Sequence, residues 1–290
     1  MRIREALAQA HAASVARLDA QWLLCHLLAR PRTWLLAHDD EPLPAAALSA
    51  WPALLARRAD GEPLAYVTGE REFCGLVLQV TPAVLVPRPE TELLVRWALE
   101  CLHTAPAPSA IDLGTGSGAI ALALLKARPG VDMLATDVSA NALAVAGANA
   151  QRHALPLRLS QGDWWGAAGQ ARFGLAVSNP PYIAAGDPHL AALAHEPLMA
   201  LGAGADGLDA LRQLVAGAPT HLLPGAWLLL EHGHDQGGAV QSLLRGRGFG
   251  PPHTRHDLAD MPRCTGAVWQ PANQSRPGRG EHGFTARSRI

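Results

Sequence analysis

The sequence predicts an α/β protein whose larger part is a doubly wound, Rossmann-like sheet. From Ala110 onward, short apolar runs alternate with segments in which apolar residues recur every three or four positions. Strands and helices alternate in this way when crossover helices join the strands of a parallel sheet. Before Ala110 the pattern is first helical and then that of two short strands. We therefore expect a small N-terminal helical domain that a β-hairpin joins to the sheet.

The N-terminal domain is predicted to be helical and to span residues 1–72. Leucines recur at helical spacing over residues 23–28, after Asp19, whose side chain is a suitable helix N-cap. A second pattern of this spacing runs from Leu48 to Leu55.

Two valine-rich segments predict the hairpin. Residues 77–80 and 84–86 flank Thr81-Pro82-Ala83, a sequence typical of a turn. The proline-rich segment 87–92 then leads into an amphipathic helix that begins near Leu93.

The second domain, residues 73–270, is predicted to contain the hairpin and the sheet. Phe249 and residues 267–269 are expected to form a closing antiparallel pair. The tail, residues 271–290, has almost no apolar periodicity, so we expect it to be disordered. The expected strands are residues 110–113, 133–136, 157–159, 175–177 and 227–230, and the expected helices are residues 119–127, 140–149, 208–214 and 240–244.

Composition and charge are typical of a soluble globular protein. The 290 residues are 49% hydrophobic and carry a formal net charge of −1, so nothing attracts the chain as a whole to nucleic acid or to anionic membranes. We find no signal peptide and no apolar run long enough to span a membrane. The 4 cysteines show no paired spacing, which indicates reduced thiols. A cytoplasmic location is expected.

The His232-Gly233-His234 sequence is a candidate metal site. No cysteine, histidine or carboxylate lies at a familiar ligand spacing around it. We expect this segment to end a strand and the protein to bind no metal.

Residues that follow the first three strands of the sheet indicate a cofactor site, because ligands of such sheets bind at the carboxyl ends of the strands. Glycines after the first strand allow a tight turn and a close approach of the ligand to the backbone. Asp137 can accept hydrogen bonds from two ribose hydroxyls, and Asp163 with Trp164 can hold an adenine ring. A nucleoside-containing cofactor is therefore predicted. The glycine loop comprises Gly114, Thr115, Gly116, Ser117 and Gly118.

The glycine loop alone leaves two classes of enzyme open. Gly114, Gly116 and Ala119 also satisfy the dinucleotide-binding fingerprint, and Asp137 lies near the expected distance of about 20 residues from it. An NAD-dependent enzyme is therefore an alternative on this motif.

Asn179-Pro180-Pro181-Tyr182 follows the fourth strand and describes a site for a planar nitrogen. The Asn179 side-chain oxygen accepts hydrogen bonds. The two prolines lack N–H groups and hold the backbone extended, which leaves the Pro180 carbonyl as a second acceptor. Tyr182 offers a flat ring on which a flat group can lie. The alternative is a Pro-Pro turn that merely ends a strand.

The Asn179 oxygen, the Pro180 carbonyl and the Tyr182 ring have no role in hydride transfer. Two acceptors on the hydrogens of a conjugated NH2 group suit methyl transfer to nitrogen from S-adenosylmethionine, whose sulfonium leaves without a catalytic acid. Together, the glycine loop and the Asn-Pro-Pro-Tyr box favour a methyltransferase in which orientation supplies most of the rate.

Further motifs accompany these two. They are Arg57-Arg58, Glu62-Pro63-Leu64-Ala65-Tyr66, Gly69, Glu72-Phe73, Val86-Pro87-Arg88-Pro89-Glu90-Thr91-Glu92, Asp187-Pro188-His189-Leu190, Glu196-Pro197 and Glu231-His232-Gly233. With this set, the chain resembles the N5-glutamine methyltransferases of the HemK/PrmC type, which modify peptide chain release factors. The resemblance extends to about Trp269, although residues 264–268 are an imperfect version of the last strand of that family.

The resemblance implies a class I methyltransferase fold. It also implies transfer of a methyl group from S-adenosylmethionine to the side-chain amide of the glutamine in the Gly-Gly-Gln motif of class I peptide chain release factors, a step in translation termination. Residues 114–118, Asp137, Trp164 and Asn179 would hold the cofactor, and residues 179–182 would hold the glutamine. The helical domain would dock the release factor, with no direct contact to nucleic acid or membrane.

Two rival functions remain. An adenine-N6 methyltransferase acts on an equally conjugated nitrogen, but it needs a basic cleft or a module that reads its target. Residues 1–85 hold 8 arginines against 9 acidic residues and offer neither. A binding protein without activity is the other rival, and the presence of Asn179 and both prolines argues against it.

Overall fold

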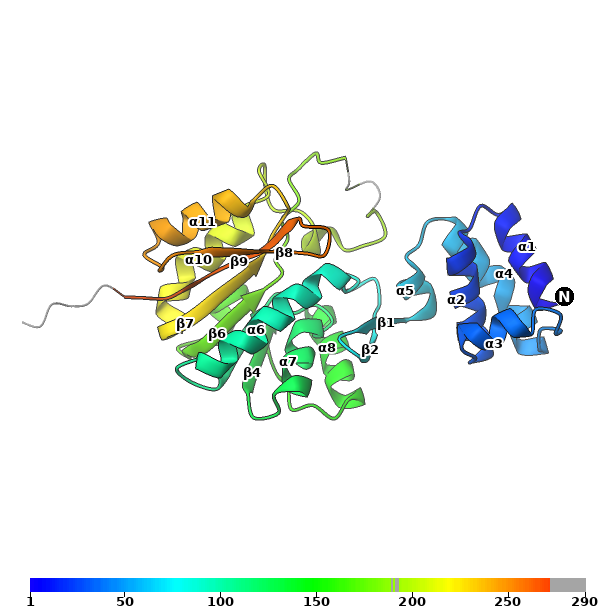
Figure 1. Ribbon diagram of the computed structural model, residues 1–290, viewed down its shortest axis with the longest axis horizontal. Helices are drawn as coiled ribbons and strands as arrows, with labels where there is room; N and C mark the ends of the chain where they lie inside the picture. Colours follow the sequence, from blue (N-terminus) through cyan, green and yellow to red (C-terminus); the bar gives the residue numbers. More distant parts are fainter. Residues whose placement is uncertain (189, 191–192, 272–290) are drawn as a thin grey trace, which may run out of the picture.

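The computed structural model describes residues 1–188, 190 and 193–271. A bundle of short helices lies at one end of the molecule, and a sheet with helices on both faces forms the larger part (Figure 1). The predicted tail of residues 271–290 lies, except for Pro271, outside the described residues. The helices of the bundle are α1 (Ile3–Ala12), α2 (Arg17–Leu28), α3 (Arg32–Ala37), α4 (Ala45–Ala59) and α5 (Leu64–Thr68).

The helical bundle has a hydrophobic core of its own. Ile3, Leu23 and Trp51 are buried in it. The indole of Trp51 donates a hydrogen bond to Gln9 Oε1 at 2.9 Å, so its one polar atom is paired. The predicted helical character of this part of the chain is confirmed.

The predicted helix cap at Asp19 is wrong. Helix α2 begins at Arg17, after Ala16, and Asp19 therefore lies in its first turn. The Asp19 carboxylate accepts a hydrogen bond from Arg58 Nε at 2.8 Å. A carboxylate is favourable both at the cap and in the first turn, so the sequence pattern does not separate the two positions.

The hairpin lies earlier in the chain than predicted. Its strands are β1 (Glu70–Phe73) and β2 (Leu76–Gln79), so the predicted pairing of residues 77–80 with 84–86 is wrong. The turn is Cys74-Gly75, whose φ angles are both positive, 48° and 72°, as in the two-residue turns that fit the twist of a hairpin. Strand β1 is mostly polar and partly exposed, which hides it from an apolar pattern.

Val84 and Val86 pack against the helical bundle instead. They form a small buried cluster with Tyr66 of α5 and with Val145, and the Tyr66 hydroxyl donates a hydrogen bond to the Val84 carbonyl. The last helix of the bundle is thereby held against the linker, residues 80–91, which leads from the hairpin to the sheet. The domain boundary near residue 72 stays a prediction.

The described sheet has seven strands in the order β5-β4-β3-β6-β7-β9-β8. Strand β9 is antiparallel to both of its neighbours, and the other pairs are parallel. Every strand predicted for the sheet is present. Phe249 and Trp269 form a single antiparallel bridge, while the longer closing pair is β8 with β9. The strands are β3 (Ser109–Leu113), β4 (Asp132–Asp137), β5 (Arg158–Gln161), β6 (Phe173–Ser178), β7 (Leu222–Glu231), β8 (His253–His256) and β9 (Pro262–Val268).

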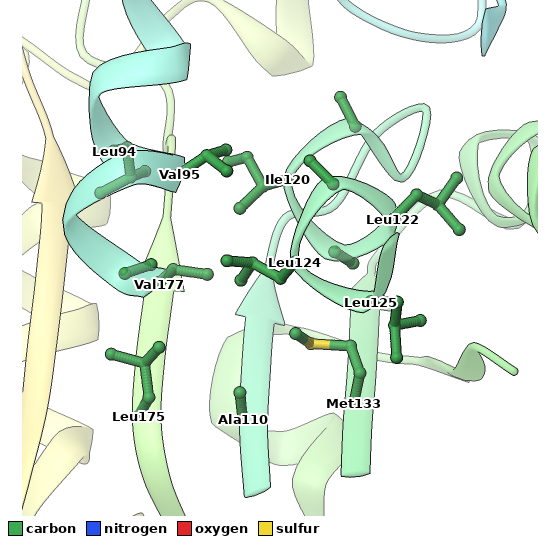
Figure 2. Packing of buried hydrophobic residues seen from close by; sticks show 14 of the residues in the cluster. Leu94, Val95, Ala110, Ile120, Leu122, Leu124, Leu125, Met133, Leu175 and Val177 are labelled. Atoms are coloured by element: carbon green, nitrogen blue, oxygen red, sulfur yellow. The ribbon is translucent and has the colours of Figure 1, made fainter. Parts of the chain in front are cut away.

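Helices cover both faces of the sheet (Figure 1). On one face, two helices pack on Ala110, Met133 and Val177 of three neighbouring strands (Figure 2). The first helix contributes Leu94 and Val95, and the helix of residues 119–127 contributes its apolar side. The helices of this face are α6 (Glu92–Thr104), α7 (Ala119–Ala127) and α8 (Ala140–Arg152), and those of the other face are α10 (Asp209–His221) and α11 (Gly237–Gly246). Short 3₁₀ helices are η1 (Pro89–Thr91), η2 (Trp164–Ala168) and η3 (Leu198–Ala200).

The strand order changes direction between β3 and β6. The chain runs outward from β3 to β5, returns to β6 beside β3, and then continues toward the opposite edge. The loops that leave the carboxyl ends of β3 and β6 therefore diverge, and a doubly wound sheet binds its ligands in the crevice that this creates.

Candidate active site

A cavity of about 620 Å³ lies at the carboxyl ends of β3, β4 and β6. This size is within the range of small-molecule sites, about 300 to 1,000 Å³. The predicted site residues that line it are Gly114, Thr115, Gly116, Ser117, Asp137, Asp163, Trp164, Asn179 and Pro181. Three others, Gly118, Pro180 and Tyr182, are not among its lining residues.

The glycine loop connects β3 to α7. Gly114, Gly116 and Gly118 have φ angles of 74°, 55° and 81°, which side chains rarely adopt. A Cβ atom at Gly116 would meet nothing within 4 Å, so the space beside its backbone is open to a ligand. A Cβ at Gly118 would lie 3.3 Å from the Cβ of Ala146, so that glycine allows α7 to pack against α8.

Asp137 is bonded to the glycine loop. Its Oδ2 accepts a hydrogen bond from the Gly116 N–H and its Oδ1 accepts one from the Ser139 N–H, both at 2.9 Å. A carboxylate has about four lone-pair sites, so two remain for ribose hydroxyls. The carboxylate therefore fits the role predicted for it.

Trp164 stands over the glycine loop at the start of η2. A Cβ atom at Gly114 would lie 3.2 Å from the Trp164 ring, which shows how closely the ring approaches this glycine. Asp163 is exposed and also lines the cavity. An aromatic face and a carboxylate thus lie side by side at the wall where an adenine is predicted.

Asn179 is tied to the linker that precedes α6. Its Nδ2 donates a hydrogen bond to Thr91 Oγ1 at 3.1 Å. Thr91, like Arg88, lines the cavity. Both residues belong to the motif of residues 86–92, and the sequence alone indicates no role for either of them.

Pro180 is buried, and Tyr182 is partly buried. Burial raises the pKa of the Tyr182 hydroxyl far above its usual range. The Tyr182 carbonyl accepts a hydrogen bond from Gln236 Nε2 at 2.9 Å, and Gln236 Oε1 accepts one from the Gly233 N–H at 2.9 Å. Gln236, which sequence reasoning missed, therefore braces the Asn-Pro-Pro-Tyr box against the loop after β7.

The segment between β6 and α10 contributes Pro197, Met199 and Ala200 to the lining of the cavity. The buried Glu196 carboxylate accepts a hydrogen bond from the Val86 N–H at 3.2 Å and pairs with Arg88. His195 Nε2 lies 3.3 Å from the Asp60 carbonyl of the helical bundle. The wall of the cavity is thus connected to both the linker and the N-terminal bundle.

Asp112, at the end of β3, is a buried carboxylate behind the loop. Burial raises its pKa to about 7, although Thr115 Oγ1 donates a hydrogen bond to its Oδ2 at 2.7 Å. Within residues 1–188, 190 and 193–271, no three His, Cys, Asp or Glu side chains gather so that they could hold a metal ion. In the same residues, no helix combines the length and the apolar content that crossing a membrane requires.

The fold and the cavity define a class I methyltransferase. Family models match residues 2–69, as the PrmC N-terminal domain, and residues 91–200, as the Methyltransferase small domain. The chain is 51% identical over 253 residues to a release factor glutamine methyltransferase of Bordetella pertussis, which covers 86% of this chain and 94% of the relative. Identity to the protein of that name from Escherichia coli is 42% over 266 residues, 91% of this chain and 96% of the relative.

The chain belongs to the release factor glutamine methyltransferase family, and its cofactor is S-adenosylmethionine. Solved structures with the same fold include a methyltransferase from Pyrococcus furiosus, with a TM-score of 0.51 at 18% identity over 73% of this chain and 96% of that one. The catalytic domain of hMettl16 in complex with an RNA hairpin has a TM-score of 0.57 at 16% identity over 76% of this chain and 82% of that one. At such identity the similarity shows the fold alone.

Proposed function

We propose that this protein transfers a methyl group from S-adenosylmethionine to the side-chain amide nitrogen (N5) of the glutamine in the Gly-Gly-Gln motif of class I peptide chain release factors. The names of its relatives support this substrate. The observation that carries the proposal is the position of Asn179. This residue directly follows the end of β6 and lines the cavity.

The residues of the cavity fit the cofactor. The open backbone at Gly116, the Asp137 carboxylate and the Trp164 ring would hold its methionine, ribose and adenine parts. When bound, S-adenosylmethionine supplies a methyl group on a positively charged sulfur that leaves as a neutral thioether. No acid is needed for that departure.

Asn179 orients the substrate amide. Its Oδ1 accepts a hydrogen bond from the amide NH2 group and so shifts the electron density of the N–H bond toward the nitrogen, which becomes the better nucleophile. The nitrogen gains a bond to the methyl carbon and releases one proton to water, so a neutral methylamide remains. The hydrogen bond strengthens while the nitrogen carries positive charge, which stabilises the transition state more than the bound substrate.

Pro180 and Tyr182 complete the substrate site in this proposal. The Pro180 carbonyl accepts a hydrogen bond from the second amide hydrogen, and the Tyr182 ring restrains the amide plane. The brace that Gln236 provides to the Tyr182 backbone supports this role, because it fixes the segment on which both residues lie.

The helical domain, residues 1–72, docks the release factor. The hydrogen bond from Tyr66 to the Val84 carbonyl and the contact of His195 with Asp60 support this assignment. They connect the helical bundle to the segments that form the wall of the cavity, so a protein docked on the bundle lies close to the reacting atoms.

The direct test is incubation with labelled S-adenosylmethionine and purified release factors, DNA and RNA, followed by mass mapping of the label. We expect one methyl group on the glutamine of the Gly-Gly-Gln motif. Label on adenine in nucleic acid, and none on the release factors, would establish the adenine-N6 alternative instead.

A further inference from the structure

Glu231 is a buried carboxylate that the proposed function does not use. It ends β7 directly after Leu228, Leu229 and Leu230, which are completely buried. Glu231 is itself only 1% exposed and does not line the cavity. Because taking a carboxylate out of water is costly, and a leucine here would be cheaper, its presence indicates a specific task rather than a gain in stability.

The register of two strands brings Glu231 beside Asn179. Strands β6 and β7 are parallel, with Ser178 opposite Leu230. The next residue on each strand is Asn179 and Glu231 respectively, so the two side chains leave the sheet as neighbours. Thr91, the last residue of η1, is the third member of this group of side chains and comes from the linker.

A hydrogen bond joins Asn179 to Thr91, and the Glu231 carboxyl lies close enough to both for them to affect its ionisation. Asn179 Nδ2 donates to Thr91 Oγ1 at 3.1 Å. Burial raises the pKa of the Glu231 carboxyl to about 7, and hydrogen bonding from Thr91 and Asn179 opposes this rise. Glu231 Oε2 is buried without a hydrogen-bond partner in the described part of the chain. The carboxylate therefore depends on the hydrogens of its two neighbours.

This arrangement determines the orientation of the Asn179 amide. The oxygen and nitrogen of a side-chain amide have nearly the same shape, and hydrogen bonds decide which way they face. An ionised carboxylate accepts hydrogen bonds and donates none. It therefore selects the NH2 branch of Asn179 and leaves the oxygen for the opposite side.

We propose that Glu231, together with Thr91, is a positioning residue that holds the NH2 branch of Asn179 and thereby presents Oδ1 to the substrate amide. This inference rests on the proposed function. The negative charge also polarises the Asn179 amide, because hydrogen bonds in series strengthen one another. A better acceptor at Oδ1 helps most when the substrate nitrogen becomes positive, so Glu231 acts on kcat more than on KM.

Single variants test the effect on rate. Glu231→Leu extends the leucine run and removes the carboxylate, and Glu231→Gln keeps the shape but can also donate. In Glu231→Leu we expect kcat to fall on the order of 10-fold to 10²-fold, with KM for the release factor and Kd for S-adenosylmethionine within about threefold. Glu231→Gln should fall between this variant and the wild type.

Thr265→Val is the matched control. It removes a buried hydroxyl on the neighbouring strand β9 that pairs with His232 Nε2 at 2.7 Å. Its kcat should stay near that of the wild type. Wild-type kcat in Glu231→Leu, or an equal loss in Thr265→Val, would overturn the inference.

The double variant tests whether Glu231 acts through Asn179. If it does, Glu231→Leu combined with Asn179→Ala is no slower than Asn179→Ala alone. Losses that multiply would show that Glu231 acts independently, and the assignment would be wrong.

A measurement on the free protein separates this inference from the proposed function. We expect the Asn179 side-chain NH2 resonances, assigned by their absence in Asn179→Ala, to shift with pH around the pKa of about 7 in the wild type and not in Glu231→Gln. The other charged groups that act on Glu231 or Tyr182, which are Arg88, Arg263 and Glu90, are present in both proteins. Persistent titration in Glu231→Gln would refute the positioning role, whereas a wild type that methylates no release factor would refute the proposed function.

Discussion

The Asp137 carboxylate accepts a hydrogen bond from the Gly116 N–H at 2.9 Å, which ties the end of β4 to the turn after β3. Its second oxygen is bonded to the Ser139 N–H at the start of α8. Asp137 therefore shapes the glycine loop before a ligand binds. In our proposal the same side chain also holds the ribose, so its loss would remove a direct contact and loosen the loop.

Asp137→Ala should weaken binding of S-adenosylmethionine by about 1 to 3 kcal/mol, because ribose hydroxyls and the Gly116 N–H lose their acceptor. Calorimetry on the purified protein measures this. Asp132→Ala, at the opposite and exposed end of β4, removes a surface ion pair with Arg158 and should leave binding unchanged. Tight binding of NADH without any binding of S-adenosylmethionine would contradict the assignment of the pocket.

Asn179→Ala should lower kcat on the order of 10²-fold, by analogy with the loss of one positioned hydrogen-bonding group from an active site. Asn179→Asp should be at least as slow, because it removes the NH2 group that donates to Thr91 and places a second carboxylate beside Glu231. Single-turnover methylation of a release factor gives the rates, and circular dichroism with cofactor titration checks the fold. A folded Asn179→Ala protein of near-normal rate would mean that another group activates the amide.

The sheet and the part of the cavity formed by the glycine loop and Asp137 were predictable from the sequence. Buried parallel strands are continuous apolar runs, and the predicted bounds of α7 match the observed helix at both ends. The glycine loop and Asp137 follow their strands directly, so the rule that ligands bind at the carboxyl ends was enough to place them.

The contacts that hold Asn179 and the Tyr182 backbone in place were not predictable in the same way. Thr91 and Asn179 are 88 residues apart in the chain, and Glu231 is adjacent to Asn179 only because β6 and β7 are neighbours in register. Periodicity carries no information on such contacts. Gln236 was missed for this reason too, since it supports the Tyr182 backbone across 54 residues.

The docking role of the helical bundle can be tested on its surface. Leu18 and Trp22 lie one turn apart on α2 and are 48% and 47% exposed. If a release factor covers them, Leu18→Glu combined with Trp22→Glu should raise KM for the intact release factor by about tenfold or more, since burying two large apolar side chains is worth several kcal/mol. Cofactor affinity should not change.

The comparison variant is Leu258→Glu, because Leu258 is fully exposed in the loop between β8 and β9, outside the helical bundle. Surface substitutions are preferable to a truncation near Phe73. Removal of the bundle would also uncover Val84, which is buried against Tyr66. An unchanged KM in the double α2 variant would place the docking surface elsewhere.

The pH dependence of stability provides a test of the buried Glu231 that requires no substrate. An unfolded glutamate has a pKa of about 4.3, and burial raises that of Glu231 to about 7. Between these values the folded state holds a proton that the unfolded state has released. The contribution of this group to stability is therefore fully present below about pH 4 and is lost as pH rises through about 7.

Glu231→Gln removes this dependence. Relative to the wild type, the variant should be more stable at about pH 8 than at about pH 5, by on the order of 1 to 3 kcal/mol, because the wild type must then bury a charge. Urea unfolding of both proteins at the two pH values measures the difference. Asp112, whose pKa burial also raises to about 7, changes the stability of both proteins alike and cancels in the comparison. A difference that does not vary with pH would mean that Glu231 already titrates at its ordinary pKa and is paired more strongly than its contacts with Thr91 and Asn179 indicate.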